Sequence, residues 1–147
     1  MDANPLAVLL KRKQKDFVDL LVSQLKKGAF DNSYTMHPRR LAELGTDLAG
    51  RFLLFVDSTR RDDAYSFGQS AAWEGVGQKT IVLLAFALHR FCAEQLRVDA
   101  SAEPAHFDVI DSFASALLEG FMNARETQIL SDQEQIRRAL VTAQQGQ

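Results

Sequence analysis

The placement of proline is the feature that most narrows the folds open to this chain. The prolines are Pro5, Pro38 and Pro104, and each stands just before a long stretch of apolar residues with helical spacing. Proline fits the first turn of a helix, where its missing N–H group has no partner in any case, but it disrupts a helix interior. Because no proline interrupts these stretches, the sequence predicts long helices and an all-α fold.

Apolar spacing and capping residues predict about five helices. The first would begin with Asn4 as its N-cap and run to Lys27, where Gly28 stops it. The others would cover residues 38–59, 62–74, 78–96 and 104–146. No Asn-Gly or similar hairpin signal occurs between them, so a sheet is not expected.

The helix over residues 78–96 is apolar on most of its circumference, which predicts the buried centre of a helical bundle. Its apolar run from Ile81 to Leu88 is also compatible with a core strand, although the helical spacing continues beyond it. The run is far shorter than the roughly 20 residues that a membrane span needs.

Composition excludes several classes of protein. Seventeen basic and nineteen acidic side chains leave a net charge of −2, which argues against a pervasively cationic nucleic-acid binder. A single cysteine, Cys92, cannot form an internal disulfide. At the N-terminus the charges follow the apolar residues, the reverse of a secretory signal. We therefore expect a cytoplasmic protein that binds neither nucleic acid nor membrane.

The last helix is longer than one small domain requires. Beyond the domain, Ile129, Ile136 and Ala143 repeat at intervals of seven, with Ala139 and Leu140 between them. Such a seam is too narrow and too polar to be stable as a lone helix in water. Two interpretations stay open: a frayed tail, or a parallel two-helix coiled coil formed by two copies of the chain.

The second interpretation divides the chain into two parts. Residues 1–126 would form a sensor or regulatory domain, and residues 127–147 a signalling helix that leads to an output domain further along the polypeptide. The chain would then act as a homodimer.

Catalytic motifs are weak. The segment from Gly75 to Thr80 resembles a phosphate-binding loop, but Trp73 and Gln78 stand where that loop requires glycine, so a turn between helices is favoured. Acidic pairs, at residues 62–63 and at 108 with 111, are typical of first helical turns. We expect no enzymatic activity, with catalysis by Cys92 or an acidic residue as a minor alternative.

An aromatic-rich set surrounds the helix over residues 78–96, and it is interpreted as core packing or as the lining of a pocket for an unknown small ligand. The candidate lining residues are Phe67, Trp73, Phe86 and His89. No histidine has a cysteine or histidine partner at metal-ligand spacing, so a metal site is not expected. His89 alone, on an apolar helix, raises the alternative of an axial haem ligand.

The order of these features resembles a known family. The resemblance rests on three segments: FGQSAAWEG at residues 67–75, LEGF at 118–121 and ILSDQEQIR at 129–137. Together with the helix order, they resemble the N-terminal sensor domain of bacterial RsbR-type stressosome proteins, which are co-antagonists in a stress-sigma-factor pathway.

This resemblance implies a globin-like helical bundle that binds no haem and forms a dimer. It further implies a non-catalytic role in signal transduction and stress response, within a complex of protein partners. The last helix would connect the domain to its output, which is commonly a STAS domain. The family supplies no general ligand-binding residues, and none is assigned here. The alternative that the residues leave open is a haem-binding gas or redox sensor with His89 as its axial ligand.

Overall fold

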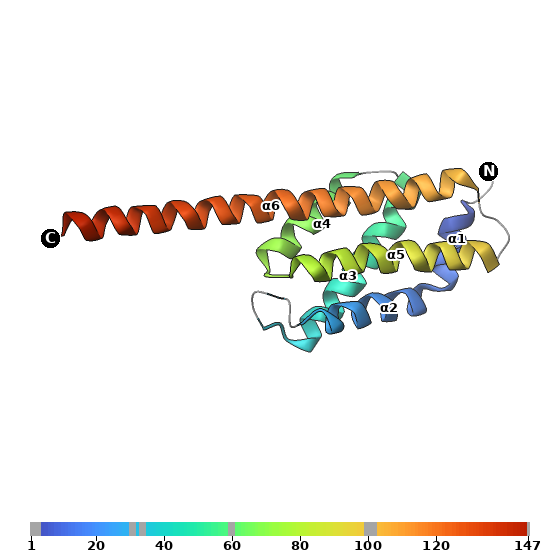
Figure 1. The fold of residues 1–147 in the computed structure, drawn as a ribbon. Coiled ribbons are helices and arrows are strands. Elements are labelled where there is room, and N and C mark those ends of the chain that lie inside the picture. Colours follow the sequence, from blue (N-terminus) through green and yellow to red (C-terminus); the bar gives the residue numbers. More distant parts are fainter. Residues whose placement is uncertain (1–3, 30–31, 33–34, 59–60, 99–102, 147) are drawn as a thin grey trace.

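The computed structural model describes residues 4–29, 32, 35–58, 61–98 and 103–146. Within these ranges the chain forms helices and short turns, and no residue is in a strand, which confirms the all-α class. The helices are α1 (Pro5–Arg12), α2 (Gln14–Lys27), α3 (Pro38–Ser58), α4 (Arg61–Trp73), α5 (Gln78–Val98) and α6 (Pro104–Gln145). Figure 1 shows α1 to α5 packed beside the N-terminal half of α6, whose other half extends far beyond them. Thr59, predicted at the end of the second helix, lies outside the described residues.

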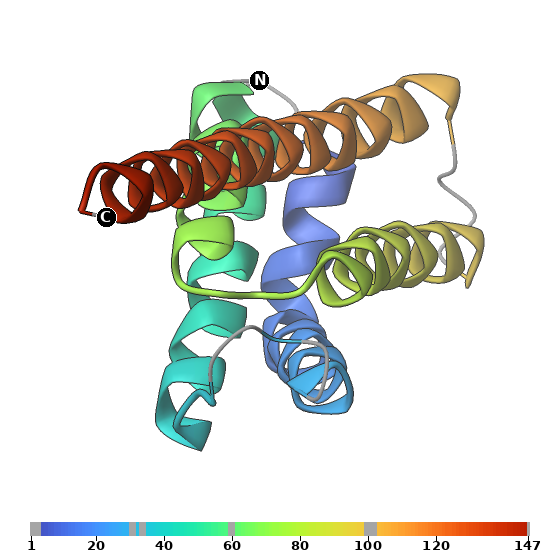
Figure 2. The same cartoon turned by 60° about the vertical axis from the view of Figure 1, so that its left-hand side comes forward.

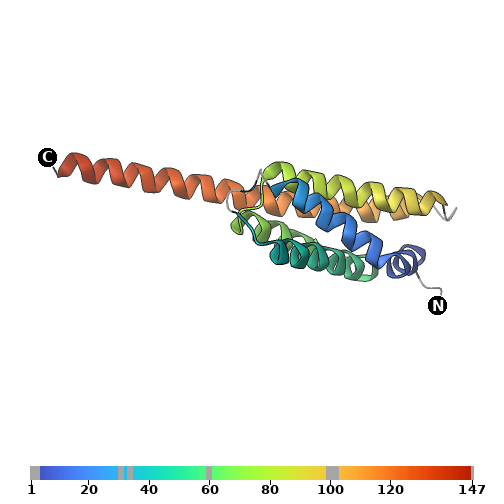
Figure 3. The ribbon, with the colours of Figure 1, turned by 90° about the horizontal axis from the view of Figure 1, so that it is seen from below.

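The first predicted helix is in fact two helices. Asn4 is the N-cap, as expected, since its side-chain oxygen accepts a hydrogen bond from the Leu6 N–H at 3.0 Å, and Gly28 ends α2. Between them Lys13 leaves helical geometry, with φ −105° and ψ 19°. The break sets α1 at an angle to α2 (Figure 3), and both helices contact α3 and α5, α1 mainly α3.

The interior is filled by phenylalanine rings from four helices. The contacting pairs, with their ring-centroid distances, are Phe17–Phe52 (5.9 Å), Phe17–Phe91 (5.1 Å), Phe52–Phe113 (4.9 Å) and Phe55–Phe113 (5.3 Å). All five side chains are buried. Tilted and edge-on rings at these distances are favourable beyond the area they bury, so α2, α3, α5 and α6 share one core.

The prediction that residues 78–96 form the buried centre is wrong. Leu88 and Cys92 are fully buried on one side of α5, but Phe86 is 67% exposed and Arg90 is also exposed. α5 therefore covers the core from one side, and its excess of apolar residues lies on the outer surface. The N-terminal half of α6 contributes as much to the core, including Phe113.

The backbones of α4 and α6 approach closely where the two helices pack together, and Figure 2 shows α6 passing across α4. A Cβ atom on Gly68 of α4 would lie 2.1 Å from the Leu117 carbonyl oxygen. A Cβ atom on Gly120 of α6 would lie 2.1 Å from the Tyr65 carbonyl oxygen. Only glycine fits at either position, because a side chain would meet rigid backbone.

The turn between α4 and α5 matches the sequence interpretation of the segment from Gly75 to Thr80. Gly75 has φ 93°, a left-handed conformation that glycine adopts at little cost. Glu74, just before it, accepts two hydrogen bonds from the guanidinium of Arg40 on α3, one of them 2.7 Å from Nε to Oε2. The Thr80 hydroxyl donates to the Gly28 carbonyl oxygen at 2.9 Å. These contacts fix where α5 begins.

Replacing Gly68 or Gly120 by alanine is expected to lower the free energy of unfolding by about 1–3 kcal/mol, the usual cost of forcing extra atoms into a packed contact. Gly50→Ala is the matched control, because Gly50 also lies within a helix and a Cβ there would meet nothing within 4 Å. Alanine is favoured over glycine in a helix by about 0.5–1 kcal/mol, so Gly50→Ala should stabilise. Urea unfolding followed by circular dichroism measures all three; equal stabilities would contradict the close crossing.

Candidate functional site

The C-terminal half of α6 extends away from the core and touches the body only near its start, where the Gln128 side-chain amide donates a hydrogen bond to the Ala72 carbonyl oxygen at 3.1 Å. From Glu126 to Gln145 no side chain is buried, and the helix continues for about 30 Å at 1.5 Å per residue (Figure 1). The helical state predicted for this segment is therefore present, although a single copy gives it no packing partner.

A line of apolar side chains runs along this free helix. Ile129 is 50%, Ile136 61% and Leu140 60% exposed, and the two alanines predicted with them, Ala139 and Ala143, are exposed as well. Leu130 and Val141 are further exposed apolar residues beside this line, which the sequence reasoning did not single out.

The same line continues onto the body of the domain. Steps of four and seven residues keep one direction on an α-helix, so Leu118 and Met122 share the direction of Ile129. We call this row the apolar stripe of α6; it consists of Leu118, Met122, Ile129, Ile136, Leu140 and Ala143. Leu118 is half-buried beside α5, whereas Met122 is 57% exposed.

On the body, α5 lies next to the stripe, and three adjoining hollows mark the groove between the two helices. Their volumes are about 270, 540 and 340 Å³. The first two share Gln78 and Arg125, and the last two share Val82 and Phe86, so together they form one continuous groove. We call this surface the α5/α6 face; its apolar members are Val82, Leu83, Ala85, Phe86, Ala114, Leu118, Phe121, Met122, Ile129 and Leu130.

An ion pair occupies one end of the α5/α6 face. His89 Nε2 lies 3.4 Å from Asp111 Oδ1, and the two side chains are 45% and 65% exposed. The Phe107 ring lies 6.3 Å from the imidazole. The sequence gives no local signal of this pair, because 21 residues lie between its two members. In the haem alternative Nε2 would bind iron, but this nitrogen faces a carboxylate at the surface, a geometry that favours an ion pair.

The four residues proposed to line a pocket do not come together. Phe86 and His89 line the same hollow of about 340 Å³. Phe67 is buried, with the Arg51 guanidinium 5.8 Å from its ring. Trp73, 57% exposed, borders a separate hollow of about 460 Å³ where α6 leaves the body.

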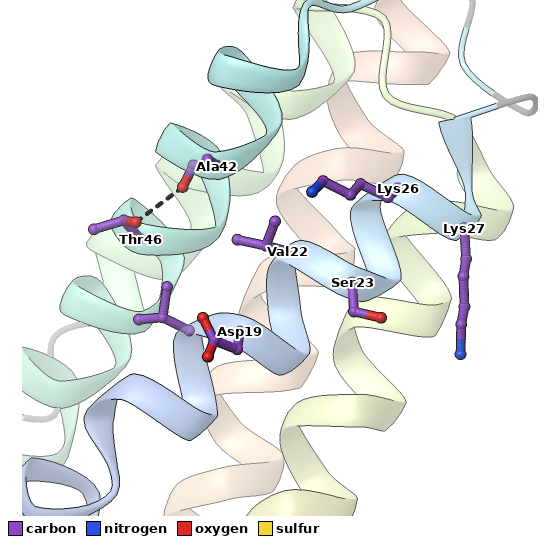
Figure 4. Close-up of a pocket in the computed structure, with 8 residues that line it drawn as sticks. Asp19, Val22, Ser23, Lys26, Lys27, Ala42 and Thr46 are labelled. Carbon is purple, nitrogen blue, oxygen red and sulfur yellow. Dashed lines mark hydrogen bonds between the residues drawn. The ribbon is translucent and has the colours of Figure 1, made fainter.

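A further hollow of about 650 Å³ lies between α2 and α3 (Figure 4). Its polar lining includes Asp19, Lys26 and Lys27, and Figure 4 shows the Lys27 side chain pointing away from Thr46. The Thr46 hydroxyl donates to the Ala42 carbonyl oxygen at 2.9 Å, so it is already engaged within α3. These groups do not converge on one point, and the hollow offers no defined binding chemistry.

Cys92, the residue considered as a catalytic nucleophile, is buried within the bundle. Burial raises the pKa of the Cys92 thiol to about 12, and the nucleophilic form of cysteine is the thiolate. Asp62 and Asp63 lie in the first turn of α4 as predicted, whereas Asp108 and Asp111 lie beyond the first turn of α6. Among the described side chains, no three His, Cys, Asp or Glu residues gather closely enough to hold a metal ion.

Of the helices in the described ranges, none combines the length and the apolar character needed to cross a membrane.

In comparisons with known proteins, no family model, no curated protein and no solved structure matches the chain. The assignment of a function therefore depends on the geometry of the α5/α6 face and of the stripe, together with the sequence resemblance.

Cys92 is expected to resist alkylation in the folded protein. At pH 8 the thiolate fraction should be about a thousandfold lower than for a thiol with the usual pKa of 9.0, because burial disfavours the charged form. Reactivity should rise with pH towards the raised pKa. Iodoacetamide labelling followed by mass spectrometry measures the rate, with the protein in concentrated urea as the reactive control. Rapid labelling of the native protein would contradict the burial of Cys92.

Proposed function

We propose that this chain is a non-catalytic sensory or regulatory domain of a cytoplasmic bacterial signal-transduction protein. Two copies associate through the apolar stripe of α6 and the α5/α6 face, and α6 relays the signal to an output domain. The observation that carries this proposal is the stripe, whose apolar residues recur from the body onto the free helix, with Arg125 between Met122 and Ile129. The resemblance to RsbR-type sensor domains supports it, and with it a globin-like helix arrangement and a role in stress response.

The free helix needs a partner for energetic reasons. Isolated helices are marginal in water, and most helical stability in proteins comes from packing an apolar side. Full burial of an isoleucine or leucine side chain contributes about 1.5–3 kcal/mol. Ile129, Ile136 and Leu140 offer this gain only when something covers them, since each is at least half exposed in a single copy.

A second copy is the partner that fits the stripe. The spacing in sevens matches a coiled coil, in which equal positions of two parallel helices face each other. In that arrangement Ile129 meets Ile129 and Ile136 meets Ile136 across the axis. The stripe continues to Met122 and Leu118, so the pairing also brings together the bodies, with Phe86 of each α5 beside the contact. The α5/α6 face and the stripe thus form one surface, and a second copy of the chain covers both parts of it.

Most charged side chains flank the stripe, whereas Arg125, seven residues after Leu118, shares its direction. The Glu134 carboxylate accepts hydrogen bonds from Arg137 at 2.7 Å and from Arg138 at 3.1 Å, and the contact with Arg137 is the main cause of the lowered pKa of Glu134. Such pairs keep the free helix soluble, whereas polar residues on the stripe's edge, Glu126 and Gln133, weaken the pairing. The coiled coil is therefore marginal in stability.

Marginal pairing suits a relay. A ligand or protein partner that binds one packing of the body better than another changes the population of the two states. Coupling of about 1–3 kcal/mol is typical of allosteric linkage, and it would be sufficient to alter the crossing or register of two weakly paired helices. The output domain would respond to that change.

Sedimentation equilibrium at micromolar concentration tests the association. The chain should form dimers, and Ile136→Asp should raise the dissociation constant at least tenfold, because a carboxylate would be placed in the apolar contact. Ser131→Asp is the matched control: Ser131 is exposed on the same helix but points about 140° away from Ile136, and it should leave the dimer unchanged. A chain that is monomeric throughout this range would overturn the proposal.

The α5/α6 face can be tested separately from the free helix. Phe86→Glu should weaken the dimer without unfolding the monomer, since Phe86 is 67% exposed. Leu54→Glu is the control, because Leu54 is 62% exposed on α3 and does not line the groove. Circular dichroism checks the fold of both variants. Equal dissociation constants for the two variants would restrict the contact to the free helix.

A further inference from the structure

The α5/α6 face carries a titratable ion pair inside an otherwise apolar groove. His89 and Asp111 line the hollow of about 340 Å³ together with Val82, Phe86 and Leu118. Their side chains contact each other across the two helices, Nε2 to Oδ1 at 3.4 Å. Both are partly exposed in a single copy, and both lie at a surface that the second copy covers.

We propose that dimerisation is linked to protonation of His89, so that two copies associate more tightly at acidic pH than at alkaline pH. The inference rests on the proposed function, because it requires that a second copy covers the α5/α6 face. It assigns to the His89–Asp111 pair the role of a proton-responsive element in the contact.

The dimer is favoured at acidic pH because covering an unpaired carboxylate is costly. In a single copy, Asp111 is 65% exposed, and water stabilises its charge whether or not His89 is protonated. When the second copy excludes this water, a carboxylate without a positive partner becomes costly. The imidazolium form of His89 supplies that partner and the neutral form does not. Association therefore takes up protons, and the dimer is favoured as pH falls.

The position of Asp111 gives a second reason why the dimer is favoured at acidic pH. Asp111 precedes Leu118 by seven residues, so it shares the direction of the stripe. In a parallel pair, equal positions of the stripe face each other, and the two Asp111 carboxylates approach across the axis. Repulsion between like charges opposes association, and protonation of each His89 offsets it.

Other charged groups near the pair are not histidines. They are Arg90 and Glu94 on α5 and Asp108 on α6, and all three are exposed. From α2, Phe17 packs on Phe91, which points about 160° away from His89 on α5.

Helices α1 and α2 also contact α5, and their charged side chains include no histidine. They are Lys11 and Arg12 on α1, and Lys15, Asp16, Asp19, Lys26 and Lys27 on α2, all exposed. The remaining histidines lie elsewhere: His37 precedes α3, and His106 is in the capping box at the start of α6.

The test is sedimentation equilibrium of the full chain at fixed ionic strength between pH 5.5 and 8.5. The dissociation constant of the dimer should fall at least about tenfold from the alkaline to the acidic end, since up to two protons are taken up per dimer. His89→Gln should remove most of this dependence. Asp111→Asn should reverse it, because the contact would then cover an imidazolium without a carboxylate, and that variant should dimerise best at alkaline pH.

His37→Gln is the matched control and should keep the wild-type pH dependence. A dimer whose affinity does not change with pH would overturn this inference and leave the proposed function standing. The inference would also be overturned by a His89→Gln variant with the wild-type slope, or by an Asp111→Asn variant that still favours acid. A monomer at every pH would overturn both. Circular dichroism at each pH shows whether the helical fold is kept. The His89 and Asp111 side chains are exposed enough to be replaced without loss of packing.

Discussion

The backbone contact between α4 and α6 is the constraint on which the rest of the structure depends. Gly68 and Gly120 let the two helices approach until a single methyl carbon would collide with a carbonyl oxygen. This contact fixes the rotation of α6 about its own axis. Leu118 and Met122 each stand two residues from Gly120, and therefore point about 160° away from it. The crossing thus turns the apolar stripe away from α4, so that most of its side chains are left exposed.

The exposed side of α5 has the same explanation. An apolar circumference predicts burial, and Phe86 contradicts this within one copy because it is two-thirds exposed. Apolar periodicity predicts which side chains are buried, but it does not show whether the same chain or another molecule covers them. If a second copy packs on the α5/α6 face, the outer residues of α5 become part of a shared four-helix core. The prediction of a buried central helix would then be wrong for the single chain and right for the pair.

The sequence predicts a structural feature well when the feature depends only on residues that are close in the chain. The cap at Asn4, the stop at Gly28 and the helical spacing of α3 to α6 depend on neighbours within a turn or two, and these predictions are confirmed. The break at Lys13 has no local signal, because neither proline nor glycine stands there. The His89–Asp111 pair was not predicted for a related reason: it depends on the register of α5 against α6.

One straight helix joins the body to the free segment, and this geometry decides how a signal could travel. A turn of α6 at the α5/α6 face rotates every later side chain by the same angle, because an α-helix transmits rotation about its axis. In a strongly packed coiled coil such a rotation would be resisted along its whole length. Glu126 and Gln133, polar and exposed beside the stripe, reduce that resistance close to the body. Weak pairing is therefore a requirement of the proposed relay, and a stripe made wholly of leucine and isoleucine would hold the two helices in one register whatever the body did.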